Sequence, residues 1–335
     1  MWRTLVFCFG LMFASGLQAD CSGPSDFDAL PPETQSQLRA KADLAPHASG
    51  LLWQVERNGH RSYIIGTLHL PVPRLAAINT QVGELMLNTD QLLLELTLDA
   101  EKTFQAALTS DPSLFLITEG PSLIDRLGEE AWTKVAALLK SRGIPSFTAA
   151  RYQPWFLGLT LAIPPCVTES IQKGELGLDR QLEQTARARD LPTGSLDTID
   201  ALIELFSSEP LDTQIAQMKE AIEAGVFGES SSPATIIDLY FKEEVQLIWT
   251  YEEWKALETA EENGEKAEAI ANQLRQLEQG LVVDRNLSWM ETLSVALAEG
   301  PTTVAVGALH LPGEQGLLAL LKAQGFRVTR VPLTQ

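Results

Sequence analysis

The sequence pattern Gly-x-Leu-His-Leu-Pro occurs twice in this chain of 335 residues, beginning at Gly66 and again at Gly307. Each copy follows a run of apolar residues typical of a buried strand, and residues with helical spacing come after it. Glycine allows a sharp backbone turn where a strand ends, so the histidine three residues later can project from the loop. The pattern therefore predicts two units of strand, loop and helix, which carry His69 and His310.

Further local signals surround the first copy. Asn58-Gly59 lies between two β-type runs and predicts a tight hairpin whose second strand ends at Gly66. Residues 74–89 have the apolar spacing of a helix, and residues 91–96 form a short apolar run that fits a buried strand. This order predicts the beginning of an α/β sheet, with Glu95 near the end of the strand at 91–96.

The middle of the chain is predicted to be mainly helical. One interruption is a short strand at 193–196, between a helix that begins at Leu178 and a helix that opens near Thr198. Five later segments have amphipathic helical spacing: 211–225, 234–248, 251–262, 265–279 and 281–298. The C-terminal unit then predicts a strand from residue 302, a helix at 313–325 and a final strand at 326–333.

We expect an α/β fold with a mixed central sheet built from the N-terminal and C-terminal units. Residues 20–335 would form a single domain, with a large helical insertion at about 120–300. Ligands of open α/β sheets gather beyond the carboxyl ends of the strands. If the two units are neighbours in one sheet, His69 and His310 face a common pocket.

The first 19 residues have the pattern of a secretory signal. Arg3 precedes a short apolar run at 5–14, and small and polar residues follow up to Ala19. The run is shorter than the ~20 residues that a membrane span needs. We therefore expect cleavage after Ala19 and export to the periplasm or the medium, without a membrane span. The charged Asp20 before Cys21 argues against lipidation.

The net charge limits the classes of partner that we expect, and the cysteine content indicates the cellular compartment. The formal net charge is −19, and loss of Arg3 with the signal makes it −20. Nucleic acid and anionic membranes are poor partners, because phosphate contacts need a basic face. After cleavage two cysteines remain, Cys21 and Cys166, and an even pair in an exported protein suggests a disulfide. The alternative is two unpaired thiols.

The two histidines suggest a metal site. Two neutral imidazoles and a carboxylate commonly hold a divalent metal with one position open for water. Glu95 is the expected carboxylate, either as a ligand or as the base that takes the water proton. The alternative is structural, since a histidine beside a strand more often makes only a structural hydrogen bond.

The sequence also resembles the TraB/GumN family, which is similar to the animal TIKI metalloproteases. The resemblance rests on seven stretches: GTLH at 66–69, LLLEL at 92–96, YQPW at 152–155, ELGLD at 175–179, SLDT at 195–198, DRNLSW at 284–289, and GALHLPGEQGLLALLKAQGFRV at 307–328. They follow the family's order and span residues ~50–335. The two GxxH motifs are the most specific of them.

This resemblance implies a fold shared with erythromycin-esterase-like and ChaN-like proteins, and a pocket around both histidines and Glu95. For the TIKI branch it implies a divalent-cation-dependent peptidase, with manganese or cobalt favoured. We expect a divalent cation here as well, with zinc as a third candidate beside manganese and cobalt. Where many relatives have Leu-Glu-Thr, this chain has Leu196-Asp197-Thr198. Because its side chain is shorter, Asp197 ranks below Glu95 as a ligand.

Five further residues are candidates for the pocket, each with a structural alternative. Asp179 lies at a helix start, where a carboxylate also stabilises the helix dipole. Arg285 and Asn286 could reach a substrate carboxylate or the acids of the pocket, or form a salt bridge to a neighbouring helix. Tyr152 and Trp155 could line a substrate groove or belong to a core.

The leading hypothesis is an exported metal-dependent hydrolase, peptidase-like, that acts on a peptide or protein. His69, His310 and Glu95 would hold the metal, and Arg285 or a histidine would stabilise the developing oxyanion. The alternatives are a non-catalytic protein that binds a metal, haem or a peptide in the same pocket, and a purely structural site.

Overall fold

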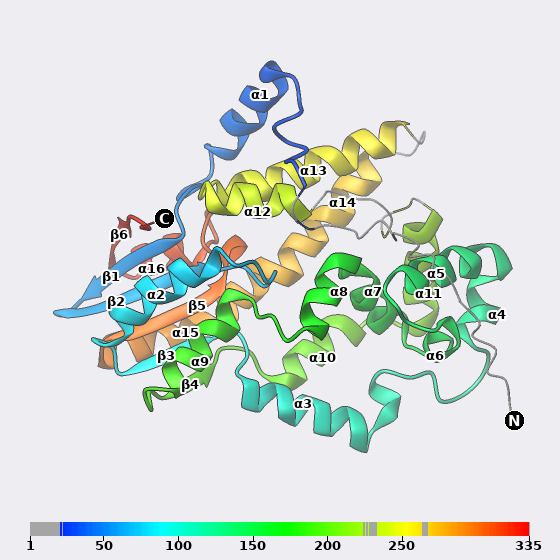
Figure 1. The fold of residues 1–335 in the computed structure, drawn as a ribbon, viewed down its shortest axis with the longest axis horizontal. Coiled ribbons are helices and arrows are strands. Elements are labelled where there is room, and N and C mark those ends of the chain that lie inside the picture. The colour runs from blue at the N-terminus through cyan, green and yellow to red at the C-terminus, as the bar shows by residue number, and fades with distance from the viewer. Residues whose placement is uncertain are drawn as a thin grey trace, which may run out of the picture.

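A six-stranded mixed sheet forms the centre of the fold (Figure 1). The computed structural model describes residues 21, 23–223, 225, 227, 233–262 and 267–334, so the predicted signal and its cleavage site lie outside the described residues. The strands are β1 (Leu52–Arg57), β2 (His60–Thr67), β3 (Gln91–Leu94), β4 (Thr193–Ser195), β5 (Thr302–Gly307) and β6 (Arg327–Val331). Their order is β4-β3-β5-β2-β1-β6, with β1 antiparallel to both of its neighbours. The expected α/β fold with a sheet built from both ends of the chain is confirmed.

The first two strands form the predicted hairpin. Asn58 and Gly59 have φ angles of 54° and 85°, the left-handed region that a two-residue type I′ turn requires. Arg57 pairs with His60 directly across this turn, and the register runs on to Leu52 and Ile65. A local sequence signal therefore determines where β2 begins and on which face its side chains lie.

The strand from the C-terminal unit lies directly beside β2. β5 pairs in parallel with β2, with Gly66 opposite Val306 and Thr67 opposite Gly307. On its other edge, β5 pairs in parallel with β3, with Leu94 opposite Ala305. The loops that follow β2, β3 and β5 therefore leave the sheet at one edge, as expected for the two histidine loops.

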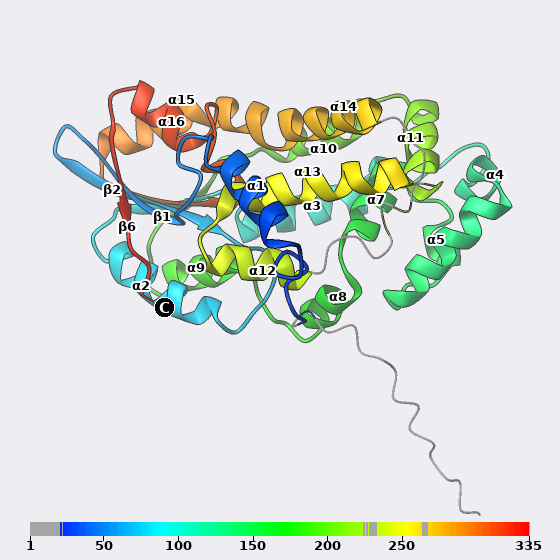
Figure 2. The ribbon, with the colours of Figure 1, turned by 90° about the horizontal axis from the view of Figure 1, so that it is seen from above.

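Helices cover both faces of the sheet (Figures 1 and 2). One face packs against α2 (Leu75–Met86) and α9 (Leu178–Arg187), and the other packs against α15 (Asp284–Glu299) and α16 (Leu317–Ala323). Successive strand residues alternate between the two cores: Ile65 joins the α2 and α9 side, whereas Ile64 joins the α15 and α16 side. This period-two burial explains why the strands are continuous apolar runs in the sequence.

The remaining helices form the large helical middle, which Figure 1 shows beyond the carboxyl ends of the strands. They are α3 (Leu98–Ser110), α4 (Leu123–Leu127), α5 (Glu129–Ser141), α6 (Ser146–Ala149), α7 (Pro154–Ala162), α8 (Pro165–Gln172), α10 (Ile199–Ser207), α11 (Leu211–Glu223), α12 (Pro233–Phe241), α13 (Val245–Glu262) and α14 (Ala267–Glu278). A separate apolar core joins α4, α5, α7 and α11. The helix α1 (Pro32–Ala42) packs on α13. The limits of the insertion stay a prediction.

Several predicted helix boundaries are wrong. The spacing predicts a helix break near residue 250, between the segments 234–248 and 251–262. The break lies instead between α12 and α13, where Glu243 has a φ of 58°. The Glu243 carboxylate accepts the Leu51 amide, so a distant contact accompanies the break. The segments 265–279 and 281–298 are joined through a π-helical turn at Gln279–Val283. The last predicted helix begins only at Leu317.

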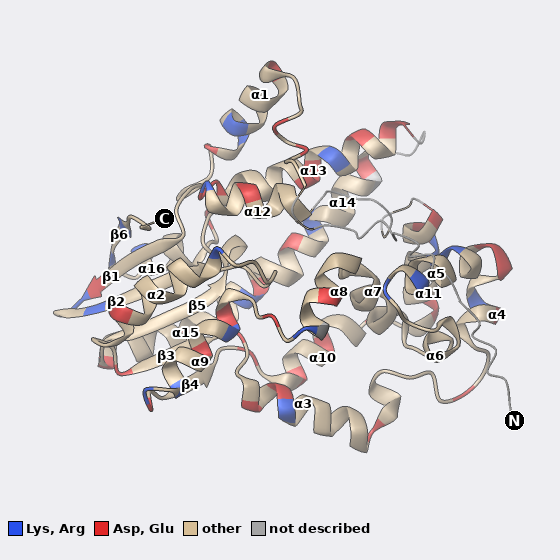
Figure 3. Cartoon of the chain, in the orientation of Figure 1, with Lys and Arg blue, Asp and Glu red and all other residues tan. Residues whose placement is uncertain are grey.

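Acidic and basic residues are interspersed over the described helices and strands (Figure 3). Within the described ranges no helix is long and apolar enough to cross a membrane. Cys21 and Cys166 form a disulfide, so the alternative of two unpaired thiols is wrong. A disulfide is typical of proteins outside the cytoplasm, in agreement with the expected export.

The disulfide ties the start of the described chain to α8 across a sequence separation of 145 residues. We predict that Cys166→Ser lowers the free energy of unfolding by about 3 kcal/mol, because the open loop raises the entropy of the unfolded chain. Urea unfolding measures this effect. Cys21→Ser and the double variant should lose the same amount, because all three break one bond. Additive losses would contradict this account.

Candidate metal and catalytic centre

Three side chains meet around Gly307 at the carboxyl edge of the sheet. A methyl group at Gly307 would lie 3.0 Å from Oε1 of Glu95 and 3.6 Å from both Nε2 of His69 and Cδ2 of His310. Parallel pairing of β2, β5 and β3 produces this arrangement, because each strand delivers one of the three. The structure thus brings together the three residues that the sequence analysis selected as ligands.

Two other glycines allow the loops to approach so closely. A Cβ at Gly66 would lie 2.9 Å from the Ala308 Cα, so only glycine lets the second histidine loop cross the end of β2. A Cβ at Gly177 would lie 2.5 Å from the His69 carbonyl oxygen, and the next amide, Leu178, donates to the Leu68 carbonyl at 2.9 Å. The start of α9 is therefore packed against the loop that carries His69.

The His310 ring is buried and its tautomer is determined by Asn286. The Asn286 Nδ2 donates to the carbonyls of His310 at 3.2 Å and Gln315 at 2.9 Å, so its Oδ1 is the atom that faces the ring. Oδ1 lies 2.7 Å from the His310 Nδ1 and must accept its proton. The lone pair is left on Nε2, which lies 3.6 Å from the Glu95 Oε1. Burial lowers the pKa of His310 to about 4, so the ring is neutral near pH 7.

His69 has the equivalent arrangement with a carboxylate. Its Nδ1 lies 3.1 Å from the Asp179 Oδ1, a buried oxygen with no other hydrogen-bond partner among the described residues. Burial lowers the pKa of His69, but the contact with Asp179 and the Asp179 and Glu95 charges outweigh it and raise the pKa to about 9. Since 61% of the His69 side chain is exposed, water screens part of this effect. Asp179 thus contacts His69 from the first turn of α9.

Glu95 is held by two donors. Its Oε1 accepts the Gly307 amide at 2.6 Å, and its Oε2 accepts from Arg285. Burial raises the pKa of Glu95, but His310, which is protonated in the acid range where Glu95 titrates, the charges of Arg285 and His69, and the Gly307 hydrogen bond lower it to about 2. A carboxylate with so low a pKa is a poor proton acceptor near neutral pH. Both Glu95 oxygens already accept hydrogen bonds from within the chain.

Arg285 is the cation of this site. Its Nη2 donates to Glu95 and to the Asp197 Oδ2 at 2.6 Å, and its Nη1 lies 3.2 Å from the His310 Nε2. Its Nε is buried without a hydrogen-bond partner among the described residues. Trp289 completes the cluster: its Nε1 donates to the Asp197 Oδ1 at 2.7 Å and its ring packs on His310 at 4.5 Å between centroids. Asp197 thus contacts the arginine rather than the two histidines.

The described residues contain no group of three histidine, cysteine or acidic side chains that stands ready as a metal site. Arg285 contacts the two atoms, His310 Nε2 and a Glu95 oxygen, that such a site would use. The donor types fit a divalent ion, but the ion and the guanidinium would compete for the same partners.

Two predicted pocket residues lie elsewhere. Tyr152 and Trp155 belong to an aromatic cluster in the helical middle, where Tyr152 contacts Phe115 and Phe156, and Trp155 stacks on Phe206 with centroids 6.0 Å apart. Their ring contacts in the described structure do not include the histidines or Glu95. A role in a substrate groove stays a prediction.

Two residues of the site were not predicted from the sequence. Trp289 lies one helical turn after Arg285, so the DRNLSW stretch contained the signal that both side chains share a helix face. Tyr240 donates from its hydroxyl to the Gly66 carbonyl at 2.8 Å and thereby holds the end of β2. It comes from α12, and no local pattern indicates this contact.

A comparison with models of known protein families finds a match over most of the chain. The model described as the TraB/PrgY/gumN family matches residues 51–330. Two curated relatives are similar over most of their length: "Uncharacterized protein YbaP" of Shigella flexneri, 25% identical over 78% of this chain and 88% of its own, and "Uncharacterized protein YbaP" of Escherichia coli (strain K12), 25% identical over 79% of this chain and 89% of its own. No solved structure matches the chain with significance.

Asn286 supports both the tautomer of His310 and the loop that carries it. We predict that Asn286→Ala lowers the free energy of unfolding by about 2–4 kcal/mol, because the His310 and Gln315 carbonyls and the buried His310 Nδ1 lose their partner. Ser288→Ala on the same helix is the matched control, since Ser288 is exposed and bonds only to the Arg285 carbonyl. Urea unfolding of both variants tests this, and equal stabilities would show that Asn286 has no special structural role.

Proposed function

The chain belongs to the TraB/PrgY/gumN family, whose model matches residues 51–330, and on that premise we propose an exported, metal-dependent hydrolase that cleaves peptide bonds. His69, His310 and Glu95 would hold a divalent ion, manganese, cobalt or zinc. The family match supports membership of the family, and the disulfide between Cys21 and Cys166 supports export. The metal and the chemistry rest on the geometry of the site.

One observation carries the proposal: both histidines hold a partner on Nδ1, while the His69 Nε2, the His310 ring and the Glu95 carboxylate surround one point at Gly307. Asn286 contacts Nδ1 of His310 at 2.7 Å and Asp179 contacts Nδ1 of His69 at 3.1 Å. Metal-binding histidines characteristically place their second nitrogen on a carboxylate or carbonyl, which orients the ring and increases its basicity. Two histidines with purely structural roles would not be expected to share this arrangement around one glycine.

The chain's own residues have distinct tasks in the proposed reaction. A bound divalent ion supplies an activated water and polarises a carbonyl. Glu95, with its pKa of about 2, stays ionised and balances the positive charge. The Arg285 guanidinium lies at the same place, where it would stabilise negative charge that develops on a carbonyl oxygen. Asp197 and Trp289 orient Arg285, because Asp197 joins the two.

Metal analysis of the purified mature protein tests the ligands. We predict about one divalent ion per chain, with loss of binding in His69→Ala and His310→Ala, because each removes one of three ligands. Gly307→Ala should also lose the ion, since its methyl group would lie 3.0 Å from the Glu95 Oε1 and fill the point between the ligands. Gly307 has a φ of −50°, so alanine is compatible with its backbone.

The matched control is His60→Ala, which removes a histidine in the hairpin, away from the carboxyl edge. Unchanged metal content in the His69 and His310 variants would refute the site. Given bound metal, digestion of a peptide library tests the reaction, and Glu95→Gln should abolish cleavage. Bound metal with no cleavage would instead identify a non-catalytic binding protein.

Arg285 gives a second test, because it and the ion compete for His310 and Glu95. We predict that Arg285→Gln binds the metal about tenfold more tightly, since a positive charge close to the ion is removed. Peptide cleavage by the same variant should fall, because the oxyanion loses its donor. Isothermal titration with Mn²⁺ measures the first effect, with the exposed Arg61→Gln as the control. Weaker metal binding by Arg285→Gln would contradict the competition.

A further inference from the structure

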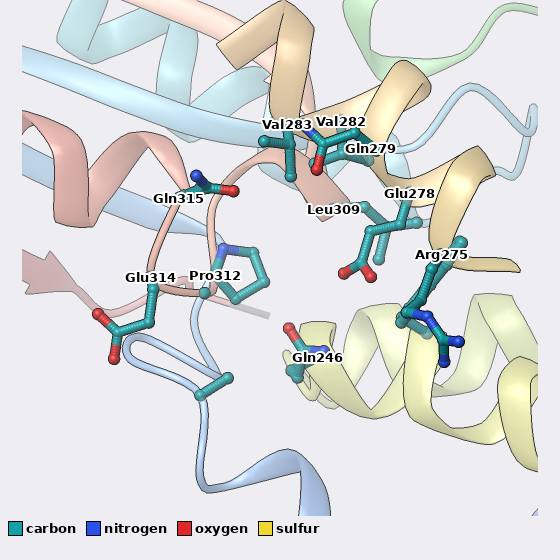
Figure 4. Close-up of a pocket in the computed structure, with 14 residues that line it drawn as sticks. Gln246, Arg275, Glu278, Gln279, Val282, Val283, Leu309, Pro312, Glu314 and Gln315 are labelled. Atoms are coloured by element: carbon teal, nitrogen blue, oxygen red, sulfur yellow. The ribbon is translucent and has the colours of Figure 1, made fainter. Parts of the chain in front are cut away.

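A cavity of about 560 Å³ lies on the other side of the loop that carries His310 (Figure 4). Its walls come from α13, from the end of α14 with the π-helical turn, and from the loop at 312–316. His69, Glu95, His310 and Arg285 do not line it. The cavity is therefore separate from the histidine site, although Leu309, the neighbour of His310, belongs to its wall.

Of the two glutamates in the wall, Glu278 and Glu314, the first directs its carboxylate into this space (Figure 4). Figure 4 shows the Glu278 carboxylate and the Gln246 amide directed toward each other across the cavity. Glu278 is half-buried, and no Lys, Arg or His of the described chain lies within ion-pair distance of it. Arg275, also in the wall, donates to Asn272 on its own helix instead. Burial and then the Glu253 charge raise the pKa of Glu278, the sign of a carboxylate that lacks compensation.

The rest of the wall combines apolar and polar side chains. Val282, Val283, Leu309, Pro312 and Trp249 give it an apolar part beside Glu278, and its other polar members are Gln246, Arg275, Gln279, Glu314 and Gln315. Apolar surface with polar groups that can orient a ligand is typical of sites for small molecules. The π-helical turn Gln279–Val283 contributes Gln279, Val282 and Val283, and π turns inside α-helices occur frequently at functional sites.

We propose that this cavity binds a primary ammonium group carried on an aliphatic chain, as in a lysine side chain or a free alkylamine. The ammonium would pair with Glu278 and donate to the Gln246 amide oxygen, and the chain would lie along Val282, Val283 and Leu309. The formal net charge of −19 also favours the approach of a cation. This site is independent of the proposed hydrolase activity, since it uses none of the residues around Gly307.

Calorimetric titration of the mature protein with hexylammonium tests the site, at ~0.15 M salt so that nonspecific attraction is screened. We expect one-site binding, and binding of hexanol at least about tenfold weaker, because a charge-assisted hydrogen bond contributes ~1.5–3 kcal/mol. A parallel titration uses acetyl-lysine amide in place of hexylammonium. Tighter binding of the lysine derivative would identify a peptide side chain as the source, and tighter binding of hexylammonium would identify a free amine.

Glu278→Gln keeps the shape of the side chain and should weaken hexylammonium at least about tenfold, because the charge that pairs with it is lost. Glu268→Gln, an exposed change on the same helix, is the matched control and should bind as wild type. Gln246→Glu places a second carboxylate opposite Glu278 and should tighten binding about threefold. Absence of binding, equal binding of hexanol, or full affinity in a folded Glu278→Gln protein would overturn the proposal.

Discussion

The parallel pairing of β2 with β5 is the constraint on which the rest of the structure depends. It joins strands from the two ends of the sequence, so that Thr67 lies opposite Gly307. Because both strands end at the same edge, their loops place His69 and His310 around one glycine, and β3 adds Glu95. The whole helical middle lies between β3 and β5 in sequence. The same strand pairing that closes the sheet therefore also brings the three side chains of the site together.

Features governed by short stretches of sequence could be predicted. Asn58-Gly59 has the φ angles that its residue types favour, and the two GxLH loops follow strand ends as their apolar runs indicated. Pairing of β2 and β5 followed from the shared motif rather than from any local propensity. Glu95 could be selected as a site residue because it lies at the end of a predicted strand that could be a neighbour of the two strands carrying the histidine loops.

Features set by distant contacts could not be predicted. The helix break at Glu243 accompanies its hydrogen bond to the Leu51 amide, 192 residues away, and amphipathic spacing does not register such a contact. The π-helical turn before Asp284 also leaves no recognisable signal in the sequence, because a single extra residue per turn leaves the helical pattern almost intact. Arg285 was foreseen as a salt-bridge partner or a substrate ligand, but its simultaneous contacts with Glu95, Asp197 and His310 require the folded arrangement of three strands.

Arg285 links the stability of this site to its chemistry. Glu95 and Asp197 are two largely buried carboxylates that both accept from the Arg285 Nη2, and without this counter-cation their burial together would be costly. The guanidinium removes that cost, yet by the same contacts it occupies the His310 lone pair that Asn286 keeps free of a proton. A divalent ion could replace it at His310 and Glu95 while Asp197 and Trp289 retain it nearby. Asp197 contacts both Arg285 and Trp289, so in the proposed metal-bound state the arginine would stay beside the ion.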